Sequence, residues 1–174
     1  MRLFIAINFP IETNKRLAEI CAGLRRAAVR GNFTLEDNFH LTLVFIGECG
    51  EERAKAAKAV IDRADFPPFS LTINRVDLFR HTGGDIYWAG FKRSAPLNIL
   101  QSFLTDNLRR AGFILENRNY TPHVTLGRGA VFPAGFQISK LEPICFTAGA
   151  VELMKSERMG GRQVYTAVYG KTLK

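Results

Sequence analysis

The sequence predicts an α+β protein with two similar lobes, each a mainly antiparallel sheet with helices on its outer face, and a central cleft between the lobes. Two observations predict this fold. Short apolar runs of strand length alternate with longer stretches whose apolar residues recur at helical spacing. In addition, the pattern His-x-Thr-x, with aliphatic residues at x, occurs twice, at residues 40–43 and 123–126. The 174 residues are enough to bury a sizeable core.

The first half of the chain, about residues 1–81, alternates strands and helices. The expected elements are a strand at 3–9 that ends at Pro10, a helix with apolar residues from Leu17 to Ala28, a strand at 39–46, a helix at about 51–64 and a strand at 69–79. Gly31 and Asn32 are expected to stop the first helix, and Pro67 follows the second. A glycine-rich turn over residues 80–84 closes this half.

The second half, about residues 82–174, restarts the pattern. The expected elements are a strand at 85–91, a helix capped by Ser94 and ended by Gly112, a strand at 120–128, a loop at 127–135, and strands at 144–154 and 163–169 joined by a hairpin turn at Gly160-Gly161. This half lacks a counterpart of the helix at 51–64.

The spacing of the motifs indicates a repeat. Phe4 precedes His40 by 36 residues (4 to 40), and Tyr87 precedes His123 by 36 residues (87 to 123). Each interval contains one amphipathic helix. We therefore expect residues 1–174 to form a single bilobed domain, in which each half contributes one motif. The spacing leaves open which lobe takes the terminal strands.

Composition limits the class of protein. The formal net charge is +8, from 24 Lys and Arg against 16 Asp and Glu, which favours polyanions such as RNA or phosphorylated metabolites but also fits a solvated basic surface. The three cysteines are odd in number and widely spaced, so neither a disulfide framework nor a zinc ribbon is indicated. No apolar run reaches the length of a membrane span or of a signal-peptide core. We expect a cytoplasmic protein that does not enter a membrane.

The motifs carry a specific chemistry. In a strand, His and Thr two residues apart point to the same face, so two such faces can hold one phosphate between two imidazoles. One ring of the pair His40 and His123 can then remove a proton from water while the other protonates the leaving oxygen. The hydroxyls of Thr42 and Thr125 can donate hydrogen bonds to phosphoryl oxygens. We expect no metal, because no carboxylate or cysteine stands beside either histidine.

Two other interpretations of the motifs remain. Both histidines could be structural residues of half-polar strands in which threonine is simply favoured. They could also bind a metal, although centres of two histidines alone are unusual. The third histidine, His81, lies in the glycine-rich turn outside either motif, and we expect it at the surface.

The residues around the motifs resemble those of a known family. They are Leu41 to Glu48 after the first histidine, Thr121-Pro122 before the second, Phe4 to Ile7, Arg128, and Leu153 to Glu157. With the doubled motif, they resemble the 2H phosphoesterase superfamily, and more narrowly the bacterial and archaeal RNA 2′,3′-cyclic phosphodiesterases, also called 2′–5′ RNA ligases. The likeness covers nearly the whole chain.

This resemblance implies the bilobed fold, and hydrolysis of an RNA 2′,3′-cyclic phosphate end to a 2′-phosphomonoester without a metal or other cofactor. It implies that His40 is the proton donor, that His123 is the proton acceptor, and that Thr42, Thr125 and Arg128 bind the phosphate. The expected partner is RNA or a nucleotide with a cyclic phosphate, and the expected state is a monomer.

Phe45 follows its histidine by five residues, as Arg128 follows His123. It could stack on a base or lie in the core. Two alternative functions also remain open. One is reversible 2′–5′ joining of RNA ends, and the other is a nucleotide- or RNA-binding module without turnover.

Overall fold

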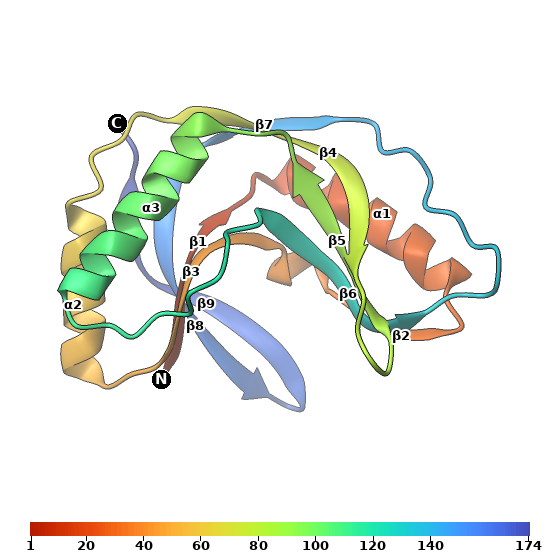
Figure 1. Ribbon diagram of the computed structural model, residues 1–174, viewed down its shortest axis with the longest axis horizontal. Helices are drawn as coiled ribbons and strands as arrows, with labels where there is room; N and C mark the ends of the chain where they lie inside the picture. Colours follow the sequence, from red (N-terminus) through yellow and green to blue (C-terminus); the bar gives the residue numbers. More distant parts are fainter.

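The computed structural model describes all 174 residues. The chain forms nine strands, three α-helices and one short 3-10 helix, and Figure 1 shows how they are arranged. In chain order these are β1 (Arg2–Asn8), α1 (Ile11–Ala27), β2 (Arg30–Phe33), η1 (Glu36–Asn38), β3 (His40–Glu48), α2 (Glu51–Asp62), β4 (Phe69–Phe79), β5 (Asp85–Phe91), α3 (Ala95–Arg110), β6 (His123–Val131), β7 (Ile144–Ala148), β8 (Ala150–Met159) and β9 (Arg162–Thr172).

The strands form two antiparallel sheets. The first sheet has the order β3-β1-β8-β9 and the second has the order β2-β6-β5-β4-β7. In Figure 1 the sheets lie side by side, with α2 and α3 outside the first sheet and α1 outside the second. The predicted α+β architecture of two antiparallel lobes with outer helices is confirmed.

Helices α1 and α3 each pack against the sheet that does not contain the strand preceding them in the chain. Helix α1 follows β1 of the first sheet but packs against β2, β6 and β7 of the second. Helix α3 follows β5 of the second sheet but packs against α2 and against β3 of the first. The terminal hairpin β8–β9 belongs to the first sheet, which answers the question that the spacing left open. Each sheet therefore takes strands from both halves of the sequence.

The core lies between the sheets and their helices. One continuous cluster of 37 buried side chains includes the inner faces of α1 and α3, where Leu17, Cys21 and Leu24 and then Leu97, Leu100, Leu104 and Leu108 recur at helical spacing. Phe4, Ala6 and Met154 form a separate small cluster on the other face of the first sheet. None of the helices combines the length and the apolar character that crossing a bilayer requires.

The predicted helix and hairpin ends are confirmed. The Ser94 hydroxyl accepts a hydrogen bond from the Leu97 N–H at 3.4 Å, which caps α3. Gly112 follows α3 with φ of 83°, and the Phe113 N–H closes the helix on the Leu108 carbonyl at 3.0 Å. Gly160 and Gly161 turn β8 into β9 with φ of 56° and 78°.

The prediction was wrong at three places. Residues 30–33, taken only as a helix stop, form edge strand β2; three of its four residues are exposed, so it carries no apolar pattern. Strand β6 continues to Val131, through part of the predicted loop at 127–135. The single strand expected at 144–154 is two strands in different sheets, separated at Gly149. The apolar pattern runs on through Gly149, which hides the crossing from one lobe to the other.

Candidate active site

Each motif lies at the start of a strand, one in each sheet, and the two strands are neighbours between the lobes. The first motif opens β3 and the second opens β6. In both strands the histidine and the threonine are half-buried, while the aliphatic residues that alternate with them are buried. This alternation follows from the two-residue period of a strand. The predicted face shared by His and Thr is therefore present in both lobes.

The strands are irregular at the same point of both motifs. In the first sheet Ile5 pairs with Val44 and Ala6 pairs with Thr42, so Leu43 has no residue opposite it. A β-bulge of this kind inserts one residue and reverses the alternation beyond it.

The second sheet repeats the irregularity. Tyr87 pairs with Gly127 and Trp88 pairs with Thr125, so Leu126 has no residue opposite it. Beyond the bulges, Val44 and Gly127 are buried, and the next residue in each strand, Phe45 or Arg128, is exposed. The bulges thus bring the fifth residue after each histidine to the face that carries His and Thr.

Both imidazoles are held in the same tautomer. His40 Nδ1 lies 2.8 Å from the carbonyl oxygen of Asn38, and His123 Nδ1 lies 2.7 Å from that of Thr121, in each case two residues earlier in the chain. A carbonyl oxygen can only accept, so Nδ1 carries the hydrogen in both rings. Nε2 is then the nitrogen that can give or take a proton in the cleft.

Burial lowers the pKa of both histidines below the usual 6.5. The hydrogen bonds to the carbonyl oxygens oppose this shift, and the positive charge of Arg128 adds to it at both rings. His123 also lowers the pKa of His40, which places the rings within electrostatic reach of one another. In the free protein both imidazoles are therefore mainly neutral at pH 7, and a bound anion would draw a proton to the pair.

Each imidazole is flanked by two aromatic rings that the sequence analysis did not assign to the site. The centroids of Phe4 and Tyr165 lie 4.8 and 4.9 Å from that of His40. Those of Phe79 and Trp88 lie 5.4 and 6.0 Å from that of His123. Phe4 and Trp88 come from the strands that pair with the motif strands, so the sequence signal for them is the strand period, once the pairing is known.

Arg128 and Phe45 lie on the cleft face of their strands. The Arg128 guanidinium donates to the Thr125 hydroxyl at 3.5 Å, so its charge lies beside the second motif. Phe45 is 38% exposed and lies parallel to Phe4, with ring centroids 6.3 Å apart. The Arg2 guanidinium carbon lies 5.0 Å from the Phe45 ring centroid. Phe45 is therefore outside the core.

Tyr120 links the two motifs and was missed by the sequence analysis. Its hydroxyl donates to the backbone carbonyl of Thr42 at 3.1 Å, which joins the segment before His123 to the first motif. Burial raises the pKa of Tyr120 well above its usual value. A neutral, buried donor in this place fixes the distance between the two strands without adding charge to the site.

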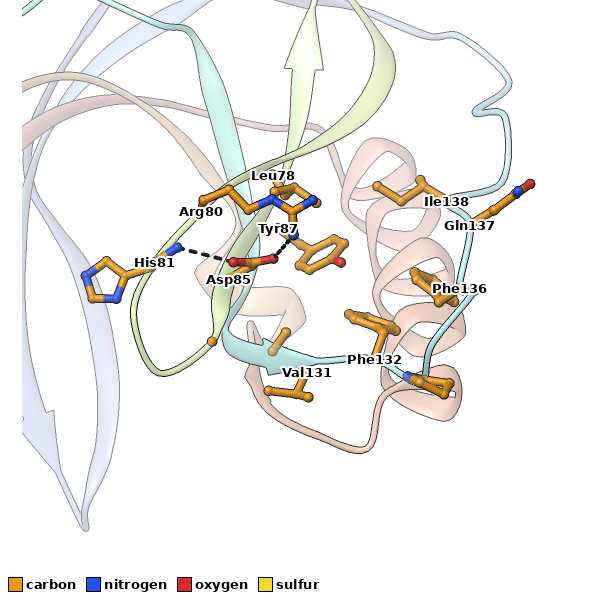
Figure 2. Close-up of a pocket in the computed structure, with 14 residues that line it drawn as sticks. Leu78, Arg80, His81, Asp85, Tyr87, Val131, Phe132, Phe136, Gln137 and Ile138 are labelled. Atoms are coloured by element: carbon orange, nitrogen blue, oxygen red, sulfur yellow. Dashed lines mark hydrogen bonds and ion pairs between the residues drawn. The ribbon is translucent and has the colours of Figure 1, made fainter.

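Other polar features lie away from the motifs. No group of three or more His, Cys, Asp or Glu side chains is placed to hold a metal ion. A cavity of about 590 Å³ lies beside the β4–β5 turn, and the residues that line it include Tyr87, Phe132, Phe136 and the Arg80–Asp85 ion pair (Figure 2). His81 is also among the residues that line this cavity, but its ring points away from the other labelled side chains in Figure 2, and the residue is exposed, as predicted. No motif residue lines the cavity.

The comparisons with known proteins agree with this geometry. The profile of the 2′-5′ RNA ligase superfamily matches residues 15–160, which include both motifs. The chain belongs to the 2′-5′ RNA ligase superfamily. The resemblance predicted from the two His-x-Thr-x motifs is therefore confirmed.

Relatives in this superfamily include two proteins named RNA 2′,3′-cyclic phosphodiesterase. The Thermotoga maritima protein is 33% identical over 136 residues, covering 76% of this chain and 72% of the relative. The Escherichia coli protein is 32% identical over 145 residues, covering 79% of this chain and 80% of the relative. A crystal structure of E. coli LigT complexed with 3′-AMP has a TM-score of 0.83 at 27% identity, over 99% of this chain and 97% of that one.

Proposed function

We propose that the protein hydrolyses RNA ends that carry a 2′,3′-cyclic phosphate, leaving a 2′-phosphomonoester. The observation that carries the proposal is the pair of equivalent imidazoles, each with its Nδ1 held by the carbonyl two residues earlier. Two rings with a free Nε2 on neighbouring strands can serve as a base and an acid on the same phosphate. The shared name of the Thermotoga maritima and E. coli relatives supports this substrate.

In the proposed reaction, His123 Nε2 takes a proton from water as its oxygen attacks phosphorus. The bond between phosphorus and the 3′ oxygen breaks, and protonated His40 Nε2 gives its proton to that oxygen. Thr42, Thr125 and Arg128 donate hydrogen bonds to the non-bridging oxygens, where negative charge concentrates in the transition state. After one turnover the proton positions on the rings are exchanged, and solvent restores them.

We infer that the partner is RNA or a nucleotide, that the enzyme acts as a monomer in the cytoplasm, and that it uses no metal. The net charge of +8 supports capture of a polyanion. Cys21, Cys49 and Cys145 are all free, which fits a reducing compartment. Activity should persist after exhaustive chelation. Loss of activity on chelation, followed by its restoration with one divalent ion, would contradict the proposed reaction.

Product analysis tests the proposal. An RNA oligonucleotide with a 2′,3′-cyclic phosphate should be converted to one with a 2′-phosphate. His40→Ala and His123→Ala should each lower turnover by about two to four orders of magnitude, the range expected for loss of a general acid or base. His81→Ala is the matched control, because this third histidine lies outside the motifs, and it should retain wild-type turnover.

Three results would contradict the proposal. A 3′-phosphate product would mean that the other ester bond breaks. Preferential joining to an added RNA 5′-hydroxyl would mean that the protein is a ligase. Binding without turnover would mean that it is a binding module.

A further inference from the structure

Beside His123, the second sheet carries a row of side chains that the proposed reaction does not use. Strand pairing places Trp88 of β5 next to Thr125 of β6. Arg75 and Phe79 lie on β4, the strand on the other side of β5. We call Phe79, Trp88 and Arg75 the aromatic strip. Its members lie on the same face of the sheet as the second motif, because Arg75 and His123 both pair with Gly90.

Phe79 has the form of a stacking platform. It is 37% exposed, whereas Trp88 beneath it is only 4% exposed. The two rings are stacked, with centroids 4.9 Å apart and planes at 26°. Phe79 also meets the His123 ring edge to face, at 88°. An exposed ring held in place by a buried one can stack on a base at a low cost in conformational entropy.

Arg75 adds positive charge to the strip. Its guanidinium carbon lies 5.5 Å from the Trp88 ring centroid. Nη1 donates to the Phe91 carbonyl at 2.6 Å and to the Asn74 side chain at 3.4 Å, whereas Nε and Nη2 have no acceptor within the chain. Those remaining N–H groups can donate to a phosphodiester.

The space for the strip depends on Gly90. A Cβ there would lie 2.7 Å from the Trp88 ring and 2.8 Å from the Arg75 guanidinium.

Asp77 is the one carboxylate of β4 and is exposed opposite Trp88. On this face Asp77 lies between Arg75 and Phe79. Its charge would repel a phosphate, so the phosphodiester is expected at the Arg75 guanidinium and not at the middle of the strip.

The first sheet does not offer an equal surface. Phe45 is exposed to the same degree as Phe79, but the Arg2 guanidinium already lies over its ring. No cation lies over the Phe79 ring. Of these two exposed phenylalanine rings, Phe79 is therefore the one without a cation on its face.

We propose that the aromatic strip binds the penultimate nucleotide of the RNA, which precedes the nucleotide with the cyclic phosphate. Its base would stack on Phe79 and its phosphodiester would lie near Arg75. This inference rests on the proposed function and narrows it: the enzyme selects RNA ends over free cyclic mononucleotides. Because one stacked base contributes about 1–3 kcal/mol, the preference should be about 5- to 150-fold in kcat/KM.

Three substrates test the strip. They are 2′,3′-cyclic AMP, the dinucleotide ApA ending in a 2′,3′-cyclic phosphate, and the same dinucleotide with an abasic first residue, which keeps the phosphodiester but cannot stack. In the wild type, ApA should exceed the abasic dinucleotide in kcat/KM by about 5- to 150-fold. Phe79→Leu, which keeps an apolar side chain but removes the ring, should lower that ratio toward one. Ile114→Ala, at a 94% exposed apolar residue, is the control and should retain the wild-type ratio.

The outcomes separate this inference from the proposed function. If Phe79→Leu lowers turnover of all three substrates equally, Phe79 only packs against His123 and the subsite is wrong. If the wild type shows a ratio near one, the subsite is wrong while the hydrolysis stands. If the wild type hydrolyses none of them, the proposed function fails.

Binding can still test the strip in that last case, because Trp88 is the only tryptophan in the chain. ApA with a 2′-phosphate should quench its fluorescence more than the abasic analogue does. Equal quenching by the two ligands would overturn the subsite.

Discussion

At the scale of single residues, the proposed reaction depends on the protonation of the two imidazoles. The proposed reaction needs one proton on the pair His40 and His123. Burial lowers both pKa values below 6.5, and the rings and Arg128 repel further protons. The free enzyme therefore holds the required proton only on the acid side of neutrality, whereas an anionic phosphate between the rings favours the protonated form.

This state of the pair predicts a displaced pH profile. The profile of kcat/KM, which reports the free enzyme, should be bell-shaped with its maximum below pH 6.5, the usual histidine value. The maximum of kcat should lie at higher pH, because the bound phosphate raises the pKa of the pair. Steady-state kinetics on 2′,3′-cyclic AMP from about pH 4.5 to 9 would measure both profiles. The two apparent constants belong to the coupled pair. A maximum of kcat/KM at or above neutral pH would contradict the shifts.

The side on which Phe45 and Arg128 lie could not be read from the sequence. The two-residue period of a strand predicts correctly that His and Thr share a face in each motif. The same period places the fifth residue after the histidine on the opposite face. The bulges at Leu43 and Leu126 reverse that order. Leucine stands at both bulges but does not mark a bulge, and the next residue is Val44 in one strand and Gly127 in the other.

At the scale of elements, the two motif strands pair in the same way, but the correspondence between their partner strands differs by one residue from the predicted one. Strand pairing makes Ala6 equivalent to Trp88, since these residues lie opposite Thr42 and Thr125. The equal spacing of 36 residues had matched Phe4 with Tyr87, yet Phe4 packs on His40 in the cleft whereas Tyr87 packs on Phe132 away from it. Intervals that contain different loops can agree in length by coincidence.

Helices and central strands were predicted best, because their apolar periodicity is continuous. The helix at residues 51–62 and the strands at 69–79 and 85–91 lie where that pattern places them. The sheet that each of β7 and β8 joins could not be predicted, because either strand would bury one face in the same way in both sheets. The aromatic neighbours of the histidines depend on that pairing and were missed for the same reason.

Strand β5 offers a test of how tightly the site is packed. Gly90→Ala should lower the free energy of unfolding by about 1–3 kcal/mol, because the new methyl group overlaps the Trp88 ring and the Arg75 guanidinium. It should also lower kcat/KM, since Trp88 contacts His123. Urea denaturation and steady-state kinetics measure the two effects. Gly149→Ala is the matched control, because no atom lies within 4 Å of a Cβ at that position. Equal stability of the two variants would contradict the packing.

At the scale of the whole molecule, each of the two sheets contributes one half-buried imidazole to the face between the lobes. The Tyr120–Thr42 hydrogen bond and the shared core hold the sheets together. Protonating both histidines would place two positive charges in a partly dry site beside Arg128. This arrangement therefore makes the folded state sensitive to acid.

The two imidazoles should make the folded protein less stable in mild acid. The folded-state pKa values of His40 and His123 lie below 6.5, so between the folded and unfolded values the unfolded chain binds more protons. Their contribution to stability is complete above pH 6.5 and is lost as the pH falls through the folded-state values. The urea midpoint of the wild type should therefore fall from neutral pH toward about pH 5, whereas His40→Gln/His123→Gln should show a flatter profile. His81→Gln, at the exposed third histidine, is the control and should follow the wild type.

Carboxylates contribute at lower pH; the pKa of Asp65, for example, is held below 3.8 by Lys171. The urea midpoints of the wild type and the double variant could instead change equally with pH from neutral to about pH 5. That result would show that the cleft does not hold its imidazoles neutral.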